Sequence, residues 1–278
     1  MTYLTLSGKV LSDSILEVAK EEVSSMKRKP GLAVVLVGDN PASVTYVDKK
    51  KKSAESVGMK FELVNLPKET SESELLSVVE RLNNDPAIDG FIVQLPLPKQ
   101  IDEKKVLLAI DSAKDVDGFH PVNMGRMLAG DESVLLPATP AGIIKMIEHF
   151  KIPVAGKHAV IVGRSNIVGK PIASLLLNRD ATVTVCHSKT KDLAVYTRTA
   201  DVLVVAVGKP KMITADMVKE GAYVIDVGTT KVEGKLTGDV DFESVIKKAH
   251  CSPVPGGVGL LTVSALISNT VKAAKSRG

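Results

Sequence analysis

The chain has 278 residues, 44% of them hydrophobic and 24% charged, which is typical of a globular protein and long enough for two domains. A net charge of +4, 3% aromatic residues and no Trp argue against a nucleic-acid-binding protein, which needs a stronger basic excess and rings for base stacking. No apolar run approaches the ~20 residues that span a bilayer, and residues 1–13 lack a signal-peptide pattern, so we expect a cytoplasmic protein.

The first half of the chain alternates short apolar runs with longer amphipathic ones. The apolar runs predict strands over residues 31–40, 59–66 and 89–98. The amphipathic runs predict helices over residues 41–57, 71–84 and 102–110.

The second half repeats this alternation with more continuous Val- and Ile-rich runs. Strands are predicted over residues 158–163, 181–186, 201–208 and 222–228. Helices are predicted over residues 141–150 and 261–276. Continuous apolar strands are typical of a parallel sheet that is buried on both faces.

These two series predict an α/β protein with two α/β domains flanking a cleft, the second domain Rossmann-like with a mainly parallel sheet. The joint is expected near residues 135–142, where two prolines precede a helix. We place the first domain at residues 1–138 and the second at 139–258. The C-terminal helix, within residues 259–278, is expected to pack back on the first domain.

A glycine-containing turn, GRSNIVGKP at residues 163–171, follows the strand at 158–162 directly. Gly163 would permit a tight turn and Gly169 would permit close packing of a helix on the strand, as in dinucleotide-binding proteins. Ser165 stands where a second glycine is usual, and the spacing is one residue longer than in the common motif. The sequence therefore indicates a dinucleotide site, and the alternative is a turn that binds no ligand.

The strand at 181–186 is followed by Ser188, Lys189 and Lys191, with no carboxylate to hold the ribose 2′-hydroxyl of NAD. A hydroxyl and cations bind a 2′-phosphate through charge-assisted hydrogen bonds, and the guanidinium of Arg164 suits a bidentate contact. The pattern favours NADP over NAD, and the alternative is that these lysines are only solvated.

Four adjacent lysines, Lys49 to Lys52, lie on the helix predicted over 41–57. Lys49 and Lys52 project away from its apolar face, whereas Lys50 and Lys51 lie on or beside it, and Lys50 is one turn after Tyr46. Desolvation and neighbouring cations would lower the pKa of a buried lysine and make it a proton acceptor near neutral pH. The alternative is that the long side chains carry both ammonium groups into water.

Six motifs occur in order along the chain. They are VGDNPASVTYVDKKKKSAESVG (37–58), DGFIVQLPLP (89–98), KDVDGFHPVN (114–123), VGRSNIVGKP (162–171), ATVTVCHSKT (181–190) and PVPGGVG (253–259). In order and spacing they resemble the bifunctional methylenetetrahydrofolate dehydrogenase/methenyltetrahydrofolate cyclohydrolase family, over nearly the whole chain.

The resemblance implies two consecutive reactions at one site. Hydride passes from 5,10-methylenetetrahydrofolate to NADP⁺, and the methenyl product is hydrolysed to 10-formyltetrahydrofolate. The family's catalytic lysine is matched by Lys50, with Tyr46 beside it; Gln94 would orient the water or tune the lysine, and Asp117 would hold the pterin. Lys52 matches a further basic position with a supporting role.

The resemblance also implies the binding residues of the two domains, with folate in the first and NADP in the second. Folate would be bound by Tyr46, Lys50, Gln94, Leu95, Pro96, Asp117, Pro255, Gly256 and Gly257. The cofactor would be bound by Gly163, Arg164, Ser165, Ile167, Gly169, Ser188, Val207, Gly208 and Thr229.

The remaining polar residues are given structural roles. Asp115 and His120 are interpreted as loop structure. No metal is expected, because the other histidines and the two cysteines have no metal-ligand spacing. These residues are His149, His158, His187, His250, Cys186 and Cys251.

Two loops depart from the family pattern. Thr229 and Thr230 follow IDVG, where the family commonly has Ile-Asn, and Leu260 and Leu261 follow GGVG, where it commonly has Pro-Met. Both loops are expected to border the cleft, near the nicotinamide and the folate.

Three alternative functions stay open. The departures allow a dehydrogenase that has lost the cyclohydrolase activity, although Tyr46, Lys50 and Gln94 argue against it. A nucleic-acid-binding module would use the lysine run, and a Rossmann-type sensor would bind a nucleotide without catalysis. The resemblance itself implies a homodimer formed through the second domain, with a part in one-carbon metabolism and purine biosynthesis.

Overall fold

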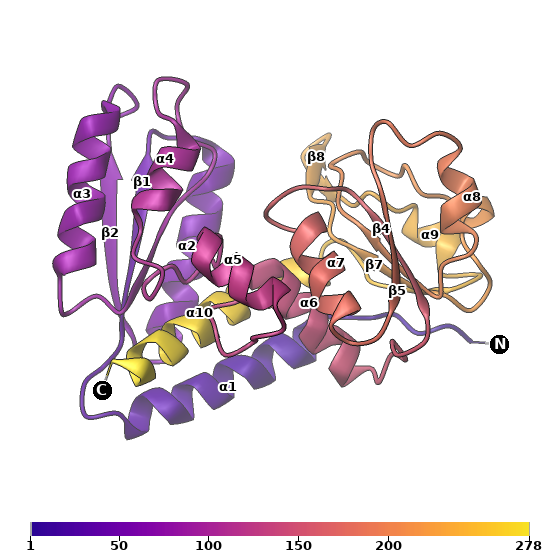
Figure 1. Cartoon of the computed structure of the whole chain (residues 1–278), viewed down its shortest axis with the longest axis horizontal. Coiled ribbons are helices and arrows are strands. Elements are labelled where there is room, and N and C mark those ends of the chain that lie inside the picture. Colours follow the sequence, from indigo (N-terminus) through magenta and orange to yellow (C-terminus); the bar gives the residue numbers. More distant parts are fainter. Residues whose placement is uncertain (1, 278) are drawn as a thin grey trace. The chain divides into compact units, whose positions relative to one another are not determined.

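The computed structural model describes residues 2–277 and divides them into two compact units, each built on its own parallel sheet (Figure 1). The three-stranded unit contains residues 13–138 and 263–277, and the five-stranded unit contains residues 2–12 and 139–262. The predicted α/β class with mainly parallel sheets is confirmed.

In the three-stranded unit, β1 (Gly31–Val37) lies between β2 (Lys60–Leu66) and β3 (Gly90–Val93) and is parallel to both. All seven residues of β1 are buried, as expected of a continuous apolar run in the centre of a parallel sheet. The helices are α2 (Pro41–Ser56), α3 (Glu72–Asn84), α4 (Glu103–Ala109) and α5 (Pro121–Leu128), with most of α1 (Lys9–Ser25) and α10 (Val258–Ser276).

Helix α3 illustrates how the sequence fixes one element. Ser71 and Glu74 form a reciprocal capping box, in which each side chain accepts a hydrogen bond from the backbone N–H of the other residue. Leu75, Val79 and Leu82 lie three or four residues apart on one face and are buried in the core with the inward side chains of β1 and β3. The cap therefore sets where α3 begins, and the apolar stripe sets which face it buries.

The five-stranded sheet has the order β10-β7-β6-β4-β5 and is parallel throughout. Its strands are β4 (His158–Val162), β5 (Thr182–Cys186), β6 (Val202–Val205), β7 (Tyr223–Asp226) and β10 (His250–Cys251). The other elements are α6 (Ala138–His149), α7 (Gly169–Leu177), α8 (Leu193–Thr197), the 3₁₀ turn η1 (Ala215–Met217), the hairpin β8 (Thr230–Val232) and β9 (Lys235–Thr237), and α9 (Phe242–Val245). The strand order reverses beside β4, the position at which open α/β sheets bind ligands.

All the predicted strands and helices are present, but some ends and elements differ. The strand predicted over 89–98 ends at Val93, because Pro96 and Pro98 have no N–H for a sheet ladder. The pattern also did not predict α1, α5 or the short elements of the five-stranded unit. In α1, Val10 and Val18 are exposed, so its apolar residues do not form one stripe.

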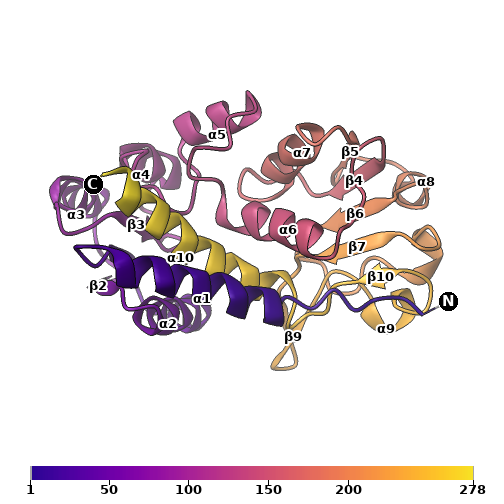
Figure 2. The same cartoon turned by 90° about the horizontal axis from the view of Figure 1, so that it is seen from below.

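The N-terminal segment belongs to a different unit from the one predicted. Residues 2–12, expected in the first domain, pack in the five-stranded unit, where Leu6 N–H donates to Cys251 O at 2.9 Å. Helix α10 lies beside α1 in the three-stranded unit (Figure 2), and Lys275 Nζ is 2.7 Å from Glu22 Oε1. Within residues 2–277, no helix combines the length and apolarity needed to cross a membrane.

Candidate functional site

Lys50 is a buried lysine at the carboxyl-end edge of the three-stranded sheet. It lies on α2, which follows β1, and only 7% of its surface is exposed. Its Nζ donates a hydrogen bond of 3.0 Å to Oε1 of Gln94, the residue directly after β3. Because β1 and β3 are parallel neighbours, their carboxyl ends lie at the same edge, which brings Gln94 to Lys50.

The side-chain amide of Gln94 is held in one orientation. Its Nε2 donates to Leu95 O at 2.8 Å, while its own backbone N–H donates to Val35 O at 2.8 Å and continues the sheet ladder. This contact turns Oε1 toward Lys50, since the opposite orientation would set an NH₂ donor against the ammonium group. Gln94 therefore offers Lys50 a fixed neutral acceptor.

Asp117 is the charged partner of Lys50. A parallel bridge pairs Asp115 with Phe91 of β3, so Asp117 follows two residues further toward the edge that carries Gln94. Burial lowers the pKa of Lys50, and the charge of Asp117 opposes this; burial likewise raises the pKa of Asp117, and Lys50 opposes that. Two groups with such opposed shifts are typical of sites that move protons.

The other lysines of the run lie outside this constellation. Lys49 Nζ is 5.7 Å from the centre of the Tyr46 ring, a cation–π contact, and Tyr46 is partly buried. Lys51 is 51% exposed with Nζ 3.9 Å from Glu55 Oε1, and Lys52 is exposed. Of the two lysines on or beside the apolar face, only Lys50 is buried.

Asp115 organises the loop that follows Asp117. Its Oδ1 accepts from the backbone N–H of Gly118 at 3.1 Å and its Oδ2 from that of His120 at 2.7 Å. His120 Nδ1 in turn accepts from Val122 N–H at 3.2 Å and caps α5. These contacts agree with the interpretation of Asp115 and His120 as loop structure.

A pocket of about 400 Å³ lies at the carboxyl ends of β4, β5 and β6 in the five-stranded unit. It coincides with the reversal of strand order and is lined by four predicted cofactor residues, Gly163, Arg164, Ser188 and Val207. Seven residues that were not predicted to bind the cofactor also line it: Val162, His187, Thr190, Leu193, Ala206, Lys209 and Met212.

The turn before α7 fits a dinucleotide phosphate. Gly163 has φ +129°, and a Cβ there would lie 2.3 Å from Ala206 O; a Cβ on Gly169 would lie 2.3 Å from Gly163 O. Ser165 Oγ accepts from the N–H groups of Val168 and Gly169 at 3.1 and 3.3 Å, so its hydroxyl braces the turn. The backbone is thus open to a close-lying pyrophosphate, and Arg164 and Ser188 line the pocket beside it.

The other five predicted cofactor residues do not line this pocket, within the part of the chain that the structure describes. Ser165 and Gly169 shape the turn, Ile167 and Thr229 are exposed, and Gly208 N–H donates to Asp239 Oδ2 at 2.9 Å. Lys209 was not predicted as a cofactor residue. Its position shortly after β6 is a signal for one, because ligands of open α/β sheets bind at the carboxyl ends of the strands. Asp239 gave no local signal, because its contact spans 31 residues.

The residues that depart from the family pattern lie in the five-stranded unit, as do three of the folate assignments. The departures at Leu260 and Leu261 fall in the first turn of α10 and not in a loop. Pro255, Gly256 and Gly257 belong to the five-stranded unit, whereas Lys50 belongs to the three-stranded unit, so their sharing of one folate site stays a prediction. Leu261 is fully buried, and a Cβ on Gly142 would lie 2.8 Å from its Cβ. The departure at Leu261 is therefore part of the packed core of that unit.

Two family models match most of the chain. The catalytic domain of the tetrahydrofolate dehydrogenase/cyclohydrolase family matches residues 6–117, and the NAD(P)-binding domain of that family matches residues 137–278. The bifunctional protein FolD of Exiguobacterium sibiricum is 54% identical over 98% of this chain and 99% of its own length. That of Halalkalibacterium halodurans is 53% identical over 99% of this chain and 100% of its own.

Solved structures agree with these relatives. The bifunctional FolD methylenetetrahydrofolate dehydrogenase/cyclohydrolase of Campylobacter jejuni has a TM-score of 0.96 and 50% identity, covering 99% of both chains. The Trypanosoma brucei enzyme, solved with NADP cofactor and inhibitor, has a TM-score of 0.95 and 37% identity, covering 100% of this chain and 99% of its own. The resemblance inferred from the sequence is confirmed.

Proposed function

This chain belongs to the tetrahydrofolate dehydrogenase/cyclohydrolase family, and from that premise we propose that Lys50 carries the proton chemistry of the cyclohydrolase step. The family's two activities are those of this chain: NADP-dependent oxidation of 5,10-methylenetetrahydrofolate and hydrolysis of the methenyl product to 10-formyltetrahydrofolate. Its cofactor is NADP.

The observation that carries the proposal is the burial of Lys50 against a neutral amide. Burial lowers the pKa of Lys50, with the charge of Asp117 opposing this, and one amide accepts from its Nζ; the neutral form, which accepts a proton, is therefore more accessible than in an exposed lysine. In the hydrolysis, water adds to the cationic methenyl carbon, Lys50 takes a proton from that water, and a proton reaches the folate nitrogen that leaves. Gln94 keeps the lysine in place. Asp117 holds the pterin by accepting hydrogen bonds from the donors of the pterin ring.

The dehydrogenase step requires positioning more than proton transfer. When bound, NADP⁺ supplies the hydride acceptor. We infer that Arg164 and Ser188 hold the 2′-phosphate, since both line the pocket and Arg164 is a fixed cation with planar donors. The turn from Gly163 to Gly169 would receive the pyrophosphate, so the five-stranded unit is the proposed NADP domain and the three-stranded unit the proposed folate domain.

Replacement of Lys50 by Met tests the catalytic assignment, because Met keeps the length of the side chain and removes its base. We expect hydrolysis of methenyltetrahydrofolate, supplied directly, to slow by roughly 10²–10⁴-fold, with NADP⁺-dependent oxidation of methylenetetrahydrofolate still detectable. The matched control is Lys51→Met, one residue along α2 and exposed, which should leave both rates unchanged. Hydrolysis at the wild-type rate in Lys50→Met would show that another group moves the proton.

The predicted homodimer, formed through the five-stranded unit, is supported by β5. This strand is an edge of its sheet, and Val185 on it and Val195 on α8 are exposed, a combination that a second chain could cover. Sedimentation equilibrium should give twice the chain mass, and a monomer at micromolar concentration would contradict the proposal. The cytoplasmic location and the supply of 10-formyltetrahydrofolate to purine biosynthesis are proposed on the family resemblance.

A further inference from the structure

Two buried carboxylates, Asp226 and Asp239, lie side by side in the five-stranded unit. Asp226 is the last residue of β7 and is 2% exposed; Asp239 follows β9 and is 0% exposed. The backbone N–H of Asp239 donates to Asp226 Oδ1 at 3.0 Å, which links the two residues directly. Neither residue belongs to a predicted binding or catalytic site.

Asp239 holds the turn that borders the nucleotide pocket. Its Oδ2 accepts from the N–H groups of Val207 and Gly208 at 2.7 and 2.9 Å, and Val207 lines the pocket. Because a trans peptide sets its N–H and C=O on opposite sides, pointing the Val207 N–H at Asp239 points the Ala206 carbonyl away from it. That carbonyl packs against Gly163, the glycine of the phosphate turn.

Asp226 holds Asp239 and the next loop in the same way. Its Oδ1 also accepts from Gly228 N–H at 2.9 Å, and its Oδ2 accepts from Val240 N–H at 2.9 Å. A Cβ on Gly228 would lie 2.4 Å from Asp239 Cγ, so the loop that leads to Thr229 packs directly on the Asp239 carboxylate. One chain of hydrogen bonds thus runs from Asp226 through Asp239 to the turn at 207–208.

This arrangement is costlier than stable packing alone requires. Each of the hydrogen-bond donors to these two carboxylates named above is a neutral backbone N–H, and burying a carboxylate without a cation carries a large desolvation cost. Burial raises the pKa of Asp226 to about 6, with the three backbone donors opposing it. In addition, Asp239 Oδ1 is buried with no hydrogen-bond partner among the described residues. Costs of this kind are retained where geometry serves a site.

We propose that Asp239, supported by Asp226, is a positioning residue that fixes the turn at 207–208 for NADP binding in the dehydrogenase step. The inference rests on the proposed NADP domain. It assigns to Asp239 an effect on cofactor binding without a direct contact, since its Oδ2 faces the N–H groups of Val207 and Gly208 and its Oδ1 is buried.

The test compares Asp239→Ala with Asp239→Asn. Ala leaves the part-buried N–H groups of Val207 and Gly208 without their acceptor and should weaken NADPH binding, followed by its fluorescence, by about tenfold or more. Asn keeps one oxygen for both donors and should recover most of the affinity. In both variants hydrolysis of methenyltetrahydrofolate, supplied directly and without cofactor, should stay near the wild-type rate, because that step is assigned to Lys50 in the other unit.

The control variant is Asp201→Ala in the same five-stranded unit. Asp201 Oδ2 also accepts from a backbone N–H, that of His158 at 3.0 Å, but at the amino end of β4 and away from the pocket. It should lower stability and leave NADPH affinity unchanged. Wild-type NADPH affinity in folded Asp239→Ala would overturn the proposal. If Asp239→Ala does not fold, Asp239→Ser replaces it, because Ser also lacks the carboxylate that accepts from the turn, and wild-type NADPH affinity in Asp239→Ser would likewise overturn the proposal. Failure of the wild-type protein to bind NADPH would instead overturn the proposed NADP domain.

Discussion

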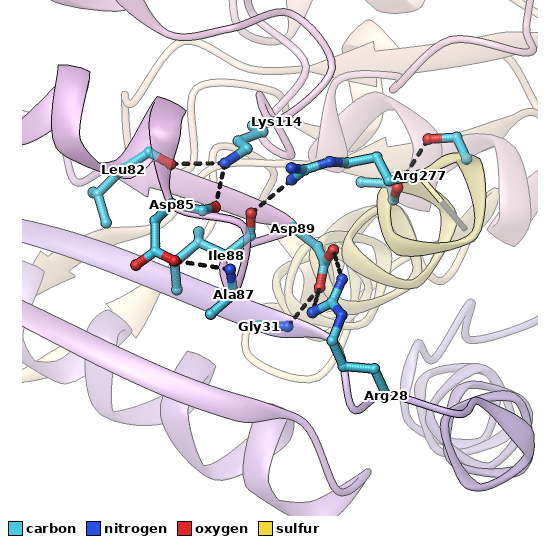
Figure 3. A network of polar contacts seen from close by, with 11 residues as sticks. Arg28, Gly31, Leu82, Asp85, Ala87, Ile88, Asp89, Lys114 and Arg277 are labelled. Atoms are coloured by element: carbon cyan, nitrogen blue, oxygen red, sulfur yellow. Dashed lines mark hydrogen bonds and ion pairs between the residues drawn. The ribbon is translucent and has the colours of Figure 1, made fainter.

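Lys50 and Lys114 are both buried lysines, yet their partners give them different chemistry. Lys114 Nζ donates to two carbonyls, Leu82 O at 2.8 Å and Asp85 O at 2.7 Å, at the end of α3 (Figure 3). The same network holds Arg277, whose Nη1 donates to Ile88 O at 2.8 Å. Burial lowers the pKa of Lys114 as it lowers that of Lys50, so the difference lies in the acceptors. Two backbone carbonyls occupy the Lys114 ammonium group and tie it into the fold, so we interpret Lys114 as structural. Lys50 donates to a single amide, with Asp117 as its charged partner, and keeps capacity for water or substrate.

The raised pKa of Asp115 gives a prediction for stability against pH. Burial raises this pKa to about 6, whereas the unfolded chain has a value near 3.9. Between about pH 4 and 6 the folded protein therefore keeps a proton that the unfolded chain has lost, so this group's contribution to the free energy of unfolding falls as pH rises. The full change is on the order of 3 kcal/mol.

The measurement is urea denaturation of wild type and Asp115→Asn from pH 4 to 7. Asn does not titrate, so the free energy of unfolding of wild type relative to the variant should decrease across this range. Groups that do not interact with Asp115 are shared and cancel in the difference, which leaves Asp115 and its charged neighbour Asp117. Parallel stability curves would show that Asp115 does not titrate in this window in the folded protein.

At the scale of elements, both sites depend on how closely one element approaches the next. Gln94 reaches Lys50 because it directly follows the end of β3 at Val93. Strand β3 pairs with β1, and α2, which carries Lys50, follows β1 in the chain. The nucleotide turn depends on α7 packing against the end of β4 with no side chain between them. Such contacts tolerate little extra volume, since protein interiors are close-packed.

Gly169→Ala should therefore disturb α7. Its Cβ would lie 2.3 Å from the backbone oxygen of Gly163, which cannot swing aside as a side chain would. We expect a loss of about 1–3 kcal/mol in the free energy of unfolding and weaker NADPH binding. Gly125→Ala in α5 is the control, because nothing lies within 4 Å of that Cβ and Ala favours a helix by roughly 0.5–1 kcal/mol. A Gly169→Ala variant as stable as wild type would show that α7 moves freely.

At the scale of the whole molecule, neither unit is one continuous segment. Residues 2–12 belong with 139–262, and residues 263–277 belong with 13–138, so the chain passes between the units three times. In the five-stranded unit the first segment is tied to β10, where Cys251 N–H donates to Leu4 O at 3.1 Å and Thr5 bridges Cys251 in parallel. The first residues of the chain therefore complete a sheet formed mostly by its second half.

Leu6→Ala tests that contribution. Leu6 is 0% exposed, and its truncation should lower the free energy of unfolding by about 2–5 kcal/mol, measured by urea denaturation. Leu4→Ala, two residues away and 48% exposed, should change it by less than about 0.5 kcal/mol. Saturating NADP should restore part of the loss in Leu6→Ala, because a ligand stabilises the unit that binds it. Equal stabilities of the two variants would show that residues 2–12 do not pack as described.

The amino-acid sequence by itself determined the α/β class, the order of the main strands and helices, the family and the preference for NADP. The class, the elements and the preference for NADP follow from local information: the period of apolar residues, the glycines at 163 and 169, and the lack of a carboxylate after β5. The family follows from the resemblance of six motifs in their order and spacing. The tertiary structure decided what local patterns leave open. In the folded chain Lys50 is buried and Lys51 is exposed. Residues 2–12 pack with the second half of the chain, and Asp239 accepts a hydrogen bond from the N–H of Val207. Burial and long-range hydrogen bonds depend on which distant segments meet, and no short stretch of sequence contains that information.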